Sequence, residues 1–196
     1  MAKRKKVLLG ILLPIFALLA LVWAKDLNPS VDKLREGDVI FHASDSRQAP
    51  MLRYATMSPV THCGIIVDKG GTLYVLEAEG KVQLTSIDKF IQRGIGKCYM
   101  VRRPSKDLGQ HIRYKQFLGM KYDIAFKFDN GKYYCSELVY DIYKNQYGVK
   151  LCDPRPLKDY HTLGIEKEAK RRGMKMDQLM VAPVDILESP FFKVVR

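Results

Sequence analysis

The chain has 196 residues, of which 47% are hydrophobic and 28% charged, and its 33 Lys and Arg exceed its 21 Asp and Glu to give a net charge of +12. This composition is that of a globular protein and excludes collagen-like, coiled-coil and wholly disordered chains. The length fits one domain, or at most two small ones. Four scattered cysteines without a CxxC pair exclude a disulfide scaffold and give no sign of zinc.

The first 24 residues have the pattern of a targeting segment. MAKRKK places four cations in six positions, and an uninterrupted apolar run follows from Val7 to Ala24. The run fits a signal peptide or, if it is not cleaved, a single membrane anchor. Because a basic cluster before such a run stays in the cytoplasm, the rest of the chain is predicted to be exported to the periplasm or cell envelope, secreted or anchored.

The positive charge is shared between this segment and the remaining chain. Without residues 1–24 the net charge falls from +12 to +8. No helix-turn-helix pattern, arginine-rich tail or aromatic RNA-binding motif accompanies it, so nucleic acid is not an expected partner. An anionic envelope polymer or a phospholipid surface fits the charge of an exported protein better.

After a polar linker at 25–35, one domain is predicted over 36–196. Strands are predicted at Asp38–His42, His62–Val67, Leu73–Glu79, Lys81–Thr85 and Lys97–Arg102. Helices are predicted at Ile87–Arg93, Ser105–Leu118, Tyr133–Gln146, Ile165–Arg172 and Val184–Leu187, and a polar loop at Ser44–Ser58. This order predicts an α+β fold with an antiparallel sheet.

The helix predicted from Tyr133 holds the most informative cysteine. Cys135 is followed by apolar residues at helical spacing, so it lies on the inward face, close to the first turn. There the helix dipole and unpaired backbone N–H groups stabilise a thiolate, the reactive form of a nucleophilic cysteine. The alternative is a small buried hydrophobic side chain, the commoner role of a cysteine.

A nucleophilic cysteine needs a base, and the predicted hairpin supplies a histidine. A four-residue loop at 68–71 places His62 opposite Glu77, whereas a two-residue turn places it opposite Glu79. Either carboxylate would lie on the same sheet face and could orient the imidazole. Glu77 is preferred as the functional carboxylate. Its neighbours are apolar, so a charge there costs more free energy than at Glu79, and a charge kept at such a cost indicates a function. A five-residue loop would weaken this pairing, and a surface cross-strand pair is the alternative.

The other cysteines give weaker signals. Cys63 follows His62 but is predicted to point to the opposite sheet face, which favours packing over catalysis. Cys98 lies in a predicted strand and Cys152 in a loop, and two of these three could form a disulfide outside the cytoplasm. No histidine has partners at metal-ligand spacing, so neither a metal nor another cofactor is predicted.

Five motifs in chain order resemble the YiiX-like branch of the NlpC-type papain-like peptidases: GDVIF (37–41), ATMSPVTHCGI (55–65), VLEA (75–78), KYD (121–123) and YYCSELVY (133–140). The resemblance covers about residues 36–190. It implies a circularly permuted papain-like fold, in which the histidine precedes the cysteine. It also implies a small antiparallel sheet packed against the helix that bears the nucleophile.

The resemblance also implies roles for individual residues. Cys135 would be the nucleophile, His62 the general base and Glu77 the group that orients the base. Four further residues would border the cleft as candidate substrate-binding residues: Ser46, Gln48, Tyr122 and Tyr134. Cys63 departs from the aliphatic residue expected after the histidine, and it could be a second reactive or disulfide-forming thiol.

The sequence therefore predicts an exported or membrane-anchored cysteine amidase or peptidase, with cell-wall peptides or related amides as substrates. Two alternatives remain open. One is an enzyme that moves or removes lipid acyl chains through a thioester. The other is a non-catalytic envelope-binding module, in which Cys135 would be alkylated slowly and would keep an ordinary thiol pKa of about 8.5.

Overall fold

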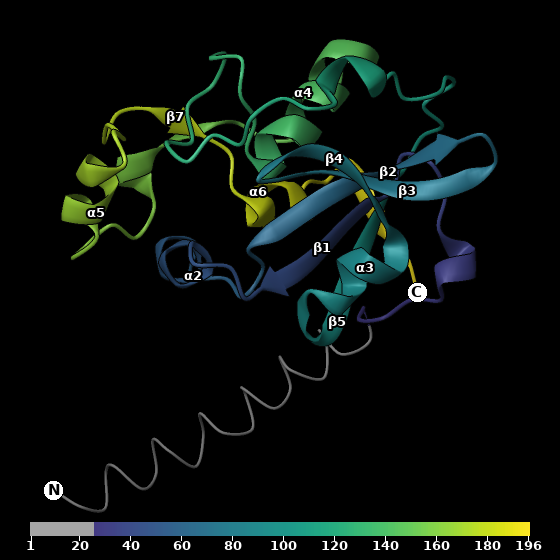
Figure 1. Ribbon diagram of the computed structural model, residues 1–196, viewed down its shortest axis with the longest axis horizontal. Coiled ribbons are helices and arrows are strands. Elements are labelled where there is room, and N and C mark those ends of the chain that lie inside the picture. The colour runs from purple at the N-terminus through teal and green to yellow at the C-terminus, as the bar shows by residue number, and fades with distance from the viewer. Residues whose placement is uncertain (1–25) are drawn as a thin grey trace, which may run out of the picture.

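A computed structural model describes residues 26–196, and the predicted targeting segment at 1–24 lies outside the described residues. Figure 1 shows a central sheet with helices on both of its faces. The six strands of this sheet follow the order β4-β3-β2-β1-β5-β8 and pair antiparallel throughout. The strands are β1 (Val39–Ser44), β2 (His62–Lys69), β3 (Thr72–Glu79), β4 (Lys81–Ser86), β5 (Gly94–Pro104) and β8 (Phe192–Val194).

The helices are mostly short. They are α2 (Ala49–Thr56), α3 (Ile87–Gln92), α4 (Cys135–Tyr147), α5 (Glu166–Arg171) and α6 (Pro183–Leu187). A second, two-stranded sheet joins β6 (Arg155–Pro156) to β7 (Leu179–Met180). The α+β class predicted from the sequence is confirmed. Between residues 26 and 196, no helix has both the length and the apolar character needed to cross a membrane.

Both faces of the central sheet are buried, which explains why its inner strands have apolar residues in succession. Alternate residues such as Phe41, Ile65 and Leu76 pack in the cluster that contains α4. Their neighbours, among them Ile40 and Ile66, pack with Phe90 of α3 on the other face. The sheet is thus held between two apolar layers, and its position relative to α4 is fixed.

The β2–β3 hairpin has the shortest of the three turns considered for it. Lys69 pairs with Thr72 and Ile65 pairs with Leu76, so the turn consists of Gly70 and Gly71 alone. Both glycines have positive φ, as such a turn requires. The four-residue loop is therefore wrong. Continued to the first residue of β2, this register would place Glu79 opposite His62.

Gly64 allows β2 and β3 to approach each other closely near the start of β2. A Cβ atom at this position would lie 2.4 Å from Cγ1 of Val75 and 2.9 Å from the carbonyl oxygen of Leu76. Any side chain would therefore push the two strands apart. The glycine keeps the first residues of β2 close to the last residues of β3.

The predicted helix at Ser105–Leu118 is wrong. Only a 3₁₀ turn at Lys115–Phe117 is helical there, and the preceding residues run without regular structure. Ile112 and Tyr114 are both buried, a spacing of two that fits extended backbone and not a helix. Instead, the backbone N–H of Ile112 donates to the carboxylate of Glu36, at 3.0 Å.

The predicted polar loop at Ser44–Ser58 contains helix α2, so it is wrong over Ala49–Thr56. Pro50 stands in the first turn, where the missing N–H costs nothing, and Ala49 and Leu52 bury the inner side of the helix. The predicted linker region also has structure of its own. There, the N–H of Asn28 donates to the carbonyl of Tyr99 in β5, and Leu34 is buried.

Helix α4 confirms the most important prediction of local structure. Its first residue is Cys135, and Gly148 ends it with a φ of 66°. The helix packs across β2 and β3 on one face of the sheet. Cys135 therefore lies at the positive end of the helix dipole, next to the strands that hold the predicted histidine and glutamate.

Candidate active site

The first residue of α4 and the first residue of β2 meet at one end of the sheet. Cys135 and His62 are both buried, and each acts on the ionisation of the other: His62 helps to lower the pKa of Cys135, and Cys135 raises the pKa of His62. They are 73 positions apart in the sequence, and the packing of α4 on β2 brings them together. A thiol and an imidazole in contact are the pair that a cysteine nucleophile requires.

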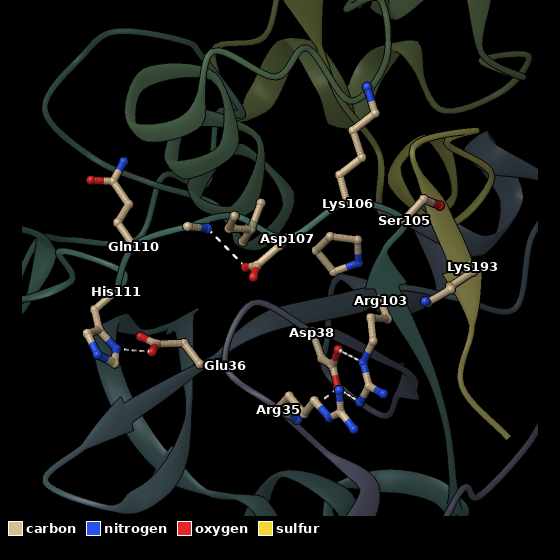
Figure 2. Close-up of a pocket in the computed structure, with 13 residues that line it drawn as sticks. Arg35, Glu36, Asp38, Arg103, Ser105, Lys106, Asp107, Gln110, His111 and Lys193 are labelled. Atoms are coloured by element: carbon tan, nitrogen blue, oxygen red, sulfur yellow. Dashed lines mark hydrogen bonds and ion pairs between the residues drawn. The ribbon is translucent and has the colours of Figure 1, made fainter.

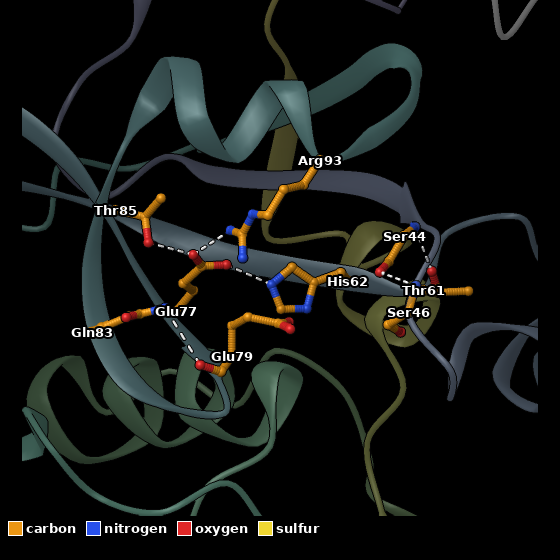
Figure 3. Close-up of polar contacts among 9 residues, drawn as sticks. All are labelled: Ser44, Ser46, Thr61, His62, Glu77, Glu79, Gln83, Thr85 and Arg93. Carbon is orange, nitrogen blue, oxygen red and sulfur yellow. Dashed lines mark hydrogen bonds and ion pairs between the residues drawn. The ribbon is translucent and has the colours of Figure 1, made fainter.

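Glu77 completes a row of three side chains. Its Oε2 lies 2.7 Å from Nε2 of His62 (Figure 3), which leaves Nδ1 as the ring nitrogen available to a second partner. Glu77 is diagonal to His62 across the hairpin, and Glu79 has the directly opposite position but is exposed. The sequence therefore identified the carboxylate that contacts His62, although the register used to place it there was wrong.

Two residues that the sequence did not single out hold the other oxygen of Glu77. The hydroxyl of Thr85 in β4 donates to Oε1 at 2.5 Å, and the guanidinium of Arg93, directly after α3, donates to the same atom (Figure 3). Glu77 pairs with Gln83, so Thr85, two residues further along, faces the same side of the sheet. A correct β3–β4 register could have found Thr85, whereas no local pattern marks Arg93.

The electrostatics favour an ion pair between Cys135 and His62. A hydrogen bond from Cys63 is the main reason why the pKa of Cys135 lies well below its ordinary value; burial opposes this, and attraction to His62 adds to it. Burial alone would lower the pKa of His62, but Cys135 and then Glu77 outweigh it and raise the pKa to about 10. At neutral pH the pair is therefore thiolate and imidazolium.

Glu77 is ionised as well. Its complete burial would raise its pKa, but hydrogen bonds from His62 and Thr85 and the charge of Arg93 lower the pKa to about 2. A buried carboxylate with all of these partners is held in one orientation. It can fix the plane of the imidazole and stabilise its positive charge.

We expect Glu77→Ala to lower the free energy of unfolding by about 3 kcal/mol, because Arg93 and His62 lose their common buried partner. Urea denaturation at pH 7 measures this loss, and Glu79→Ala, at the exposed position two residues on, should change it by at most about 0.5 kcal/mol. Equal losses in the two variants would contradict a special role for Glu77. Since its pKa is depressed in the folded protein, the contribution of Glu77 is present above pH 4.5 and disappears as the pH falls toward 2.

His42 and Phe90 lie beside His62. His42 pairs with His62 between β1 and β2, with ring centroids 5.2 Å apart, and Phe90 stacks on His42 at 4.4 Å. Burial, followed by the charges of His62 and Arg93, lowers the pKa of His42 to about 3, so this ring is neutral. Its Nδ1 has no hydrogen-bond partner among the described residues. The two rings shield the imidazole of His62 from water.

Ser46 lines a cavity next to this row. The cavity has a volume of about 230 Å³ and is bordered by His42, Ser44, Asp45, Ser46, Glu79 and Arg93. Arg93 and His42 both contact the row itself, Arg93 through Glu77 and His42 through His62. The cavity therefore opens on the side of His62.

The other predicted substrate-binding residues, Gln48, Tyr122 and Tyr134, differ in where they lie relative to Cys135. The hydroxyl of Tyr122 donates to Oε1 of Gln48 at 3.4 Å, and burial and the nearby charge of Cys135 raise the pKa of Tyr122. These two residues thus lie close to the cysteine. Tyr134 is a core residue instead: it is 1% exposed, and its hydroxyl accepts a hydrogen bond from the N–H of Val181.

A larger cavity of about 570 Å³ lies elsewhere, at the other end of β1 (Figure 2). None of the predicted site residues lines it. Two ion pairs lie among its lining residues: Asp38 with Arg103 at 2.7 Å and Glu36 with His111 at 2.5 Å. Among the predicted site residues, Ser46 lines the smaller cavity.

The four cysteines of the chain are free thiols in the structure, so no disulfide is formed between Cys63, Cys98 and Cys152. Within residues 26–196, no three side chains of His, Cys, Asp or Glu gather as metal ligands would. The described residues thus offer a thiol, an imidazole and a carboxylate as their reactive groups.

Comparisons with known proteins identify the family of this chain. Residues 33–196 match the family model described as "Permuted papain-like amidase enzyme, YaeF/YiiX, C92 family". The uncharacterized protein YiiX of Escherichia coli K12 is 28% identical over 165 residues, which cover 79% of this chain and 82% of YiiX.

A crystal structure described as that of metalloprotein yiiX from Escherichia coli O157:H7 superposes with a TM-score of 0.75 at 28% identity. The superposition covers 83% of this chain and 96% of the yiiX chain. The permuted papain-like fold and the cysteine-hydrolase class predicted from the sequence are thereby confirmed. The chain belongs to the YaeF/YiiX family of permuted papain-like amidases.

Proposed function

We propose that Cys135, His62 and Glu77 are the catalytic triad of an amidase or peptidase. The observation that carries this proposal is the buried 2.7 Å hydrogen bond between His62 and Glu77, next to a cysteine at the start of α4. Each group has the protonation state that its role requires. The thiolate is the nucleophile, the imidazolium is the proton donor and the carboxylate orients the ring.

The reaction would proceed in two steps through a thioester. The thiolate of Cys135 attacks the amide carbonyl carbon, a C–S bond forms, and the oxyanion lies near the positive end of α4. His62 gives its proton to the amine as the C–N bond breaks. Water then attacks the thioester while His62 accepts a proton, which releases the acid and restores the thiolate–imidazolium pair.

The 230 Å³ cavity supports an assignment for one half of the substrate. It borders His42 and Arg93, on the side of His62. Because His62 protonates the leaving amine, the group attached to that amine would occupy this cavity. Ser46 would then contact the leaving group, and Gln48 and Tyr122 would lie nearer to the carbonyl side.

Cell-wall peptides or related amides are the substrates we propose, and the cell envelope is the proposed location. The apolar run at 7–24 and the net charge of +8 after residue 24 support both. The yiiX crystal structure is described as that of a metalloprotein. In the described part of this chain no three side chains of His, Cys, Asp or Glu gather as metal ligands would.

Trapping the covalent intermediate tests the proposal. The protein is mixed separately with peptidoglycan fragments and with phospholipid vesicles, quenched in acid and digested, and the mass of the peptide containing Cys135 is measured. We expect a peptidyl adduct on Cys135 in wild type and in Cys152→Ser, and none in Cys135→Ala. A fatty-acyl adduct would show lipid acyl chemistry instead, and no adduct from either mixture would favour a binding module.

A further inference from the structure

Arg93 has one end in the buried row of side chains and the rest at the wall of the smaller cavity. Its guanidinium donates to Oε1 of Glu77, which is fully buried, whereas 36% of the Arg93 side chain is exposed (Figure 3). The same side chain borders the cavity of about 230 Å³. A cation that can be reached from the cavity is thus in direct contact with the carboxylate that binds His62.

The fold holds Arg93 in place. Its backbone N–H donates to the carbonyl oxygen of Phe90 at 3.3 Å as α3 ends, and its guanidinium lies over the ring of Phe90, 5.7 Å from the ring centre. The next residue, Gly94, begins β5, and a Cβ atom there would lie 2.8 Å from Nδ1 of His42. The glycine therefore lets the chain beside Arg93 pass close to His42.

Glu77 is bound by three groups of different kinds. Nε2 of His62 lies 2.7 Å from Oε2, and the hydroxyl of Thr85 and the guanidinium of Arg93 both donate to Oε1. The hydroxyl has no charge, and the charge of the imidazole depends on its proton. A guanidinium, by contrast, is always protonated in proteins. Among these three partners Arg93 is therefore the permanent counter-charge of Glu77.

A permanent counter-charge matters during the proposed reaction. His62 becomes neutral when it gives its proton to the leaving amine, and Glu77 then no longer faces an imidazolium. A buried carboxylate without a cation is costly and would take up a proton or turn away. The ion pair with Arg93 keeps Glu77 charged and in place. The carboxylate is then ready to orient the ring when His62 accepts a proton in the second step.

We propose that Arg93 is a positioning residue that acts through Glu77: its guanidinium keeps this carboxylate ionised and directed at His62 throughout the reaction. The inference rests on the proposed function, since it concerns the same triad. The other charged residues that border the cavity, Asp45 and Glu79, are exposed carboxylates and cannot supply the cation.

The test removes the guanidinium with Arg93→Ala and then returns it from solution. Guanidinium chloride supplies the cation, and urea, a neutral molecule of the same shape, is its control, both at concentrations that leave the protein folded. The rate of alkylation of Cys135 by iodoacetamide is followed across the acid and neutral pH range in the full-length protein, by mass spectrometry of the peptide containing Cys135. Arg93→Met, which keeps a side chain over Phe90, is the second variant if Arg93→Ala does not fold.

The matched control is Arg103→Ala. Arg103 also pairs with a buried carboxylate, that of Asp38 at 2.7 Å, but it lines the larger cavity at the other end of β1. Both Arg93→Ala and Arg103→Ala leave a buried charge without its partner, so both should unfold at a lower temperature than wild type. Only Arg93→Ala should change the alkylation of Cys135, which separates positioning from stability.

We expect Arg93→Ala and Arg93→Met to raise the thiol pKa of Cys135 by about half a unit, a fraction of the shift that a charge in direct contact causes. The loss of a positive charge and the looser orientation of His62 both act in this direction. Guanidinium should restore the wild-type profile of Arg93→Ala, and urea should not. An unchanged profile in the variants would overturn the proposal, as would a shift that guanidinium does not reverse or that urea reverses equally.

Turnover of peptidoglycan fragments is measured in parallel. In Arg93→Ala we expect kcat to fall at least about tenfold, with a smaller change in KM, because a displaced catalytic group slows the chemical step more than binding. A fall in KM and kcat that is the same in Arg103→Ala would contradict the positioning role. Alkylation needs no substrate, so a guanidinium-dependent alkylation profile in a protein that hydrolyses no amide would contradict only the proposed function.

Discussion

Cys135→Ala is expected to abolish amide hydrolysis, with a loss of at least about 10⁴-fold in kcat, while the protein stays folded. The substitution removes one sulfur atom at the first turn of α4, and the apolar residues that pack this helix on the sheet remain. The hydrogen bond between His62 and Glu77 also remains. Turnover of peptidoglycan fragments and thermal unfolding, measured on one preparation, test the two halves of this expectation.

The matched control is Cys98→Ala, which removes a thiol from the same sheet at a partly buried site, where the thiol bonds the carbonyl oxygen of Gly96. This variant should keep wild-type turnover. Hydrolysis that persists in Cys135→Ala would remove Cys135 from the role of nucleophile. A variant that unfolds would show that the cysteine serves packing, the alternative considered from the sequence.

His62→Asn is expected to lower kcat by about 10³-fold or more and to raise the thiol pKa of Cys135. The imidazolium is one of the groups that hold the thiol pKa of Cys135 down. Wild type should therefore be alkylated rapidly at neutral pH, since His62 keeps its proton up to a pKa of about 10. In the variant the rate at neutral pH should be lower, and the pH at which the rate rises should be higher than in wild type.

A suitable control for this experiment is His111→Asn, because His111 is exposed and pairs with Glu36 in the larger cavity. Its alkylation profile and turnover should match those of wild type. If His62→Asn kept the wild-type alkylation profile, the thiol–imidazole pair would not exist in solution, and the proposed mechanism would fail at its first step.

The parts of the site that the sequence could predict are those with a local signal. Cys135 stands at the start of a strongly patterned helix, and His62 opens an apolar strand bounded by a glycine turn. Both signals lie within a few residues of the group concerned. The cost of burying a charge favours Glu77 as the partner of His62, and Glu77 does contact His62. The four-residue loop that would place the two residues opposite each other is not the observed turn.

Other features depend on contacts between distant segments. Arg93 reaches Glu77 only because α3 returns across the sheet, and nothing near Arg93 in the sequence marks it. The segment at 105–114 has enough helix-forming residues to suggest a helix, but tertiary contacts of Ile112 outweigh that preference. Short helix α2 was missed because only two of its residues are buried.

The three reactive groups come from three different elements, α4, β2 and β3, and His62 and Cys135 are far apart in the sequence. The acidity of Cys135 therefore arises from tertiary packing and is absent from an unfolded chain, whose thiol is ordinary. Folding itself therefore lowers the pKa of the Cys135 thiol and makes this cysteine nucleophilic. A chain that crosses a membrane unfolded would do so with an unreactive cysteine, protected from oxidation and alkylation until its domain is complete.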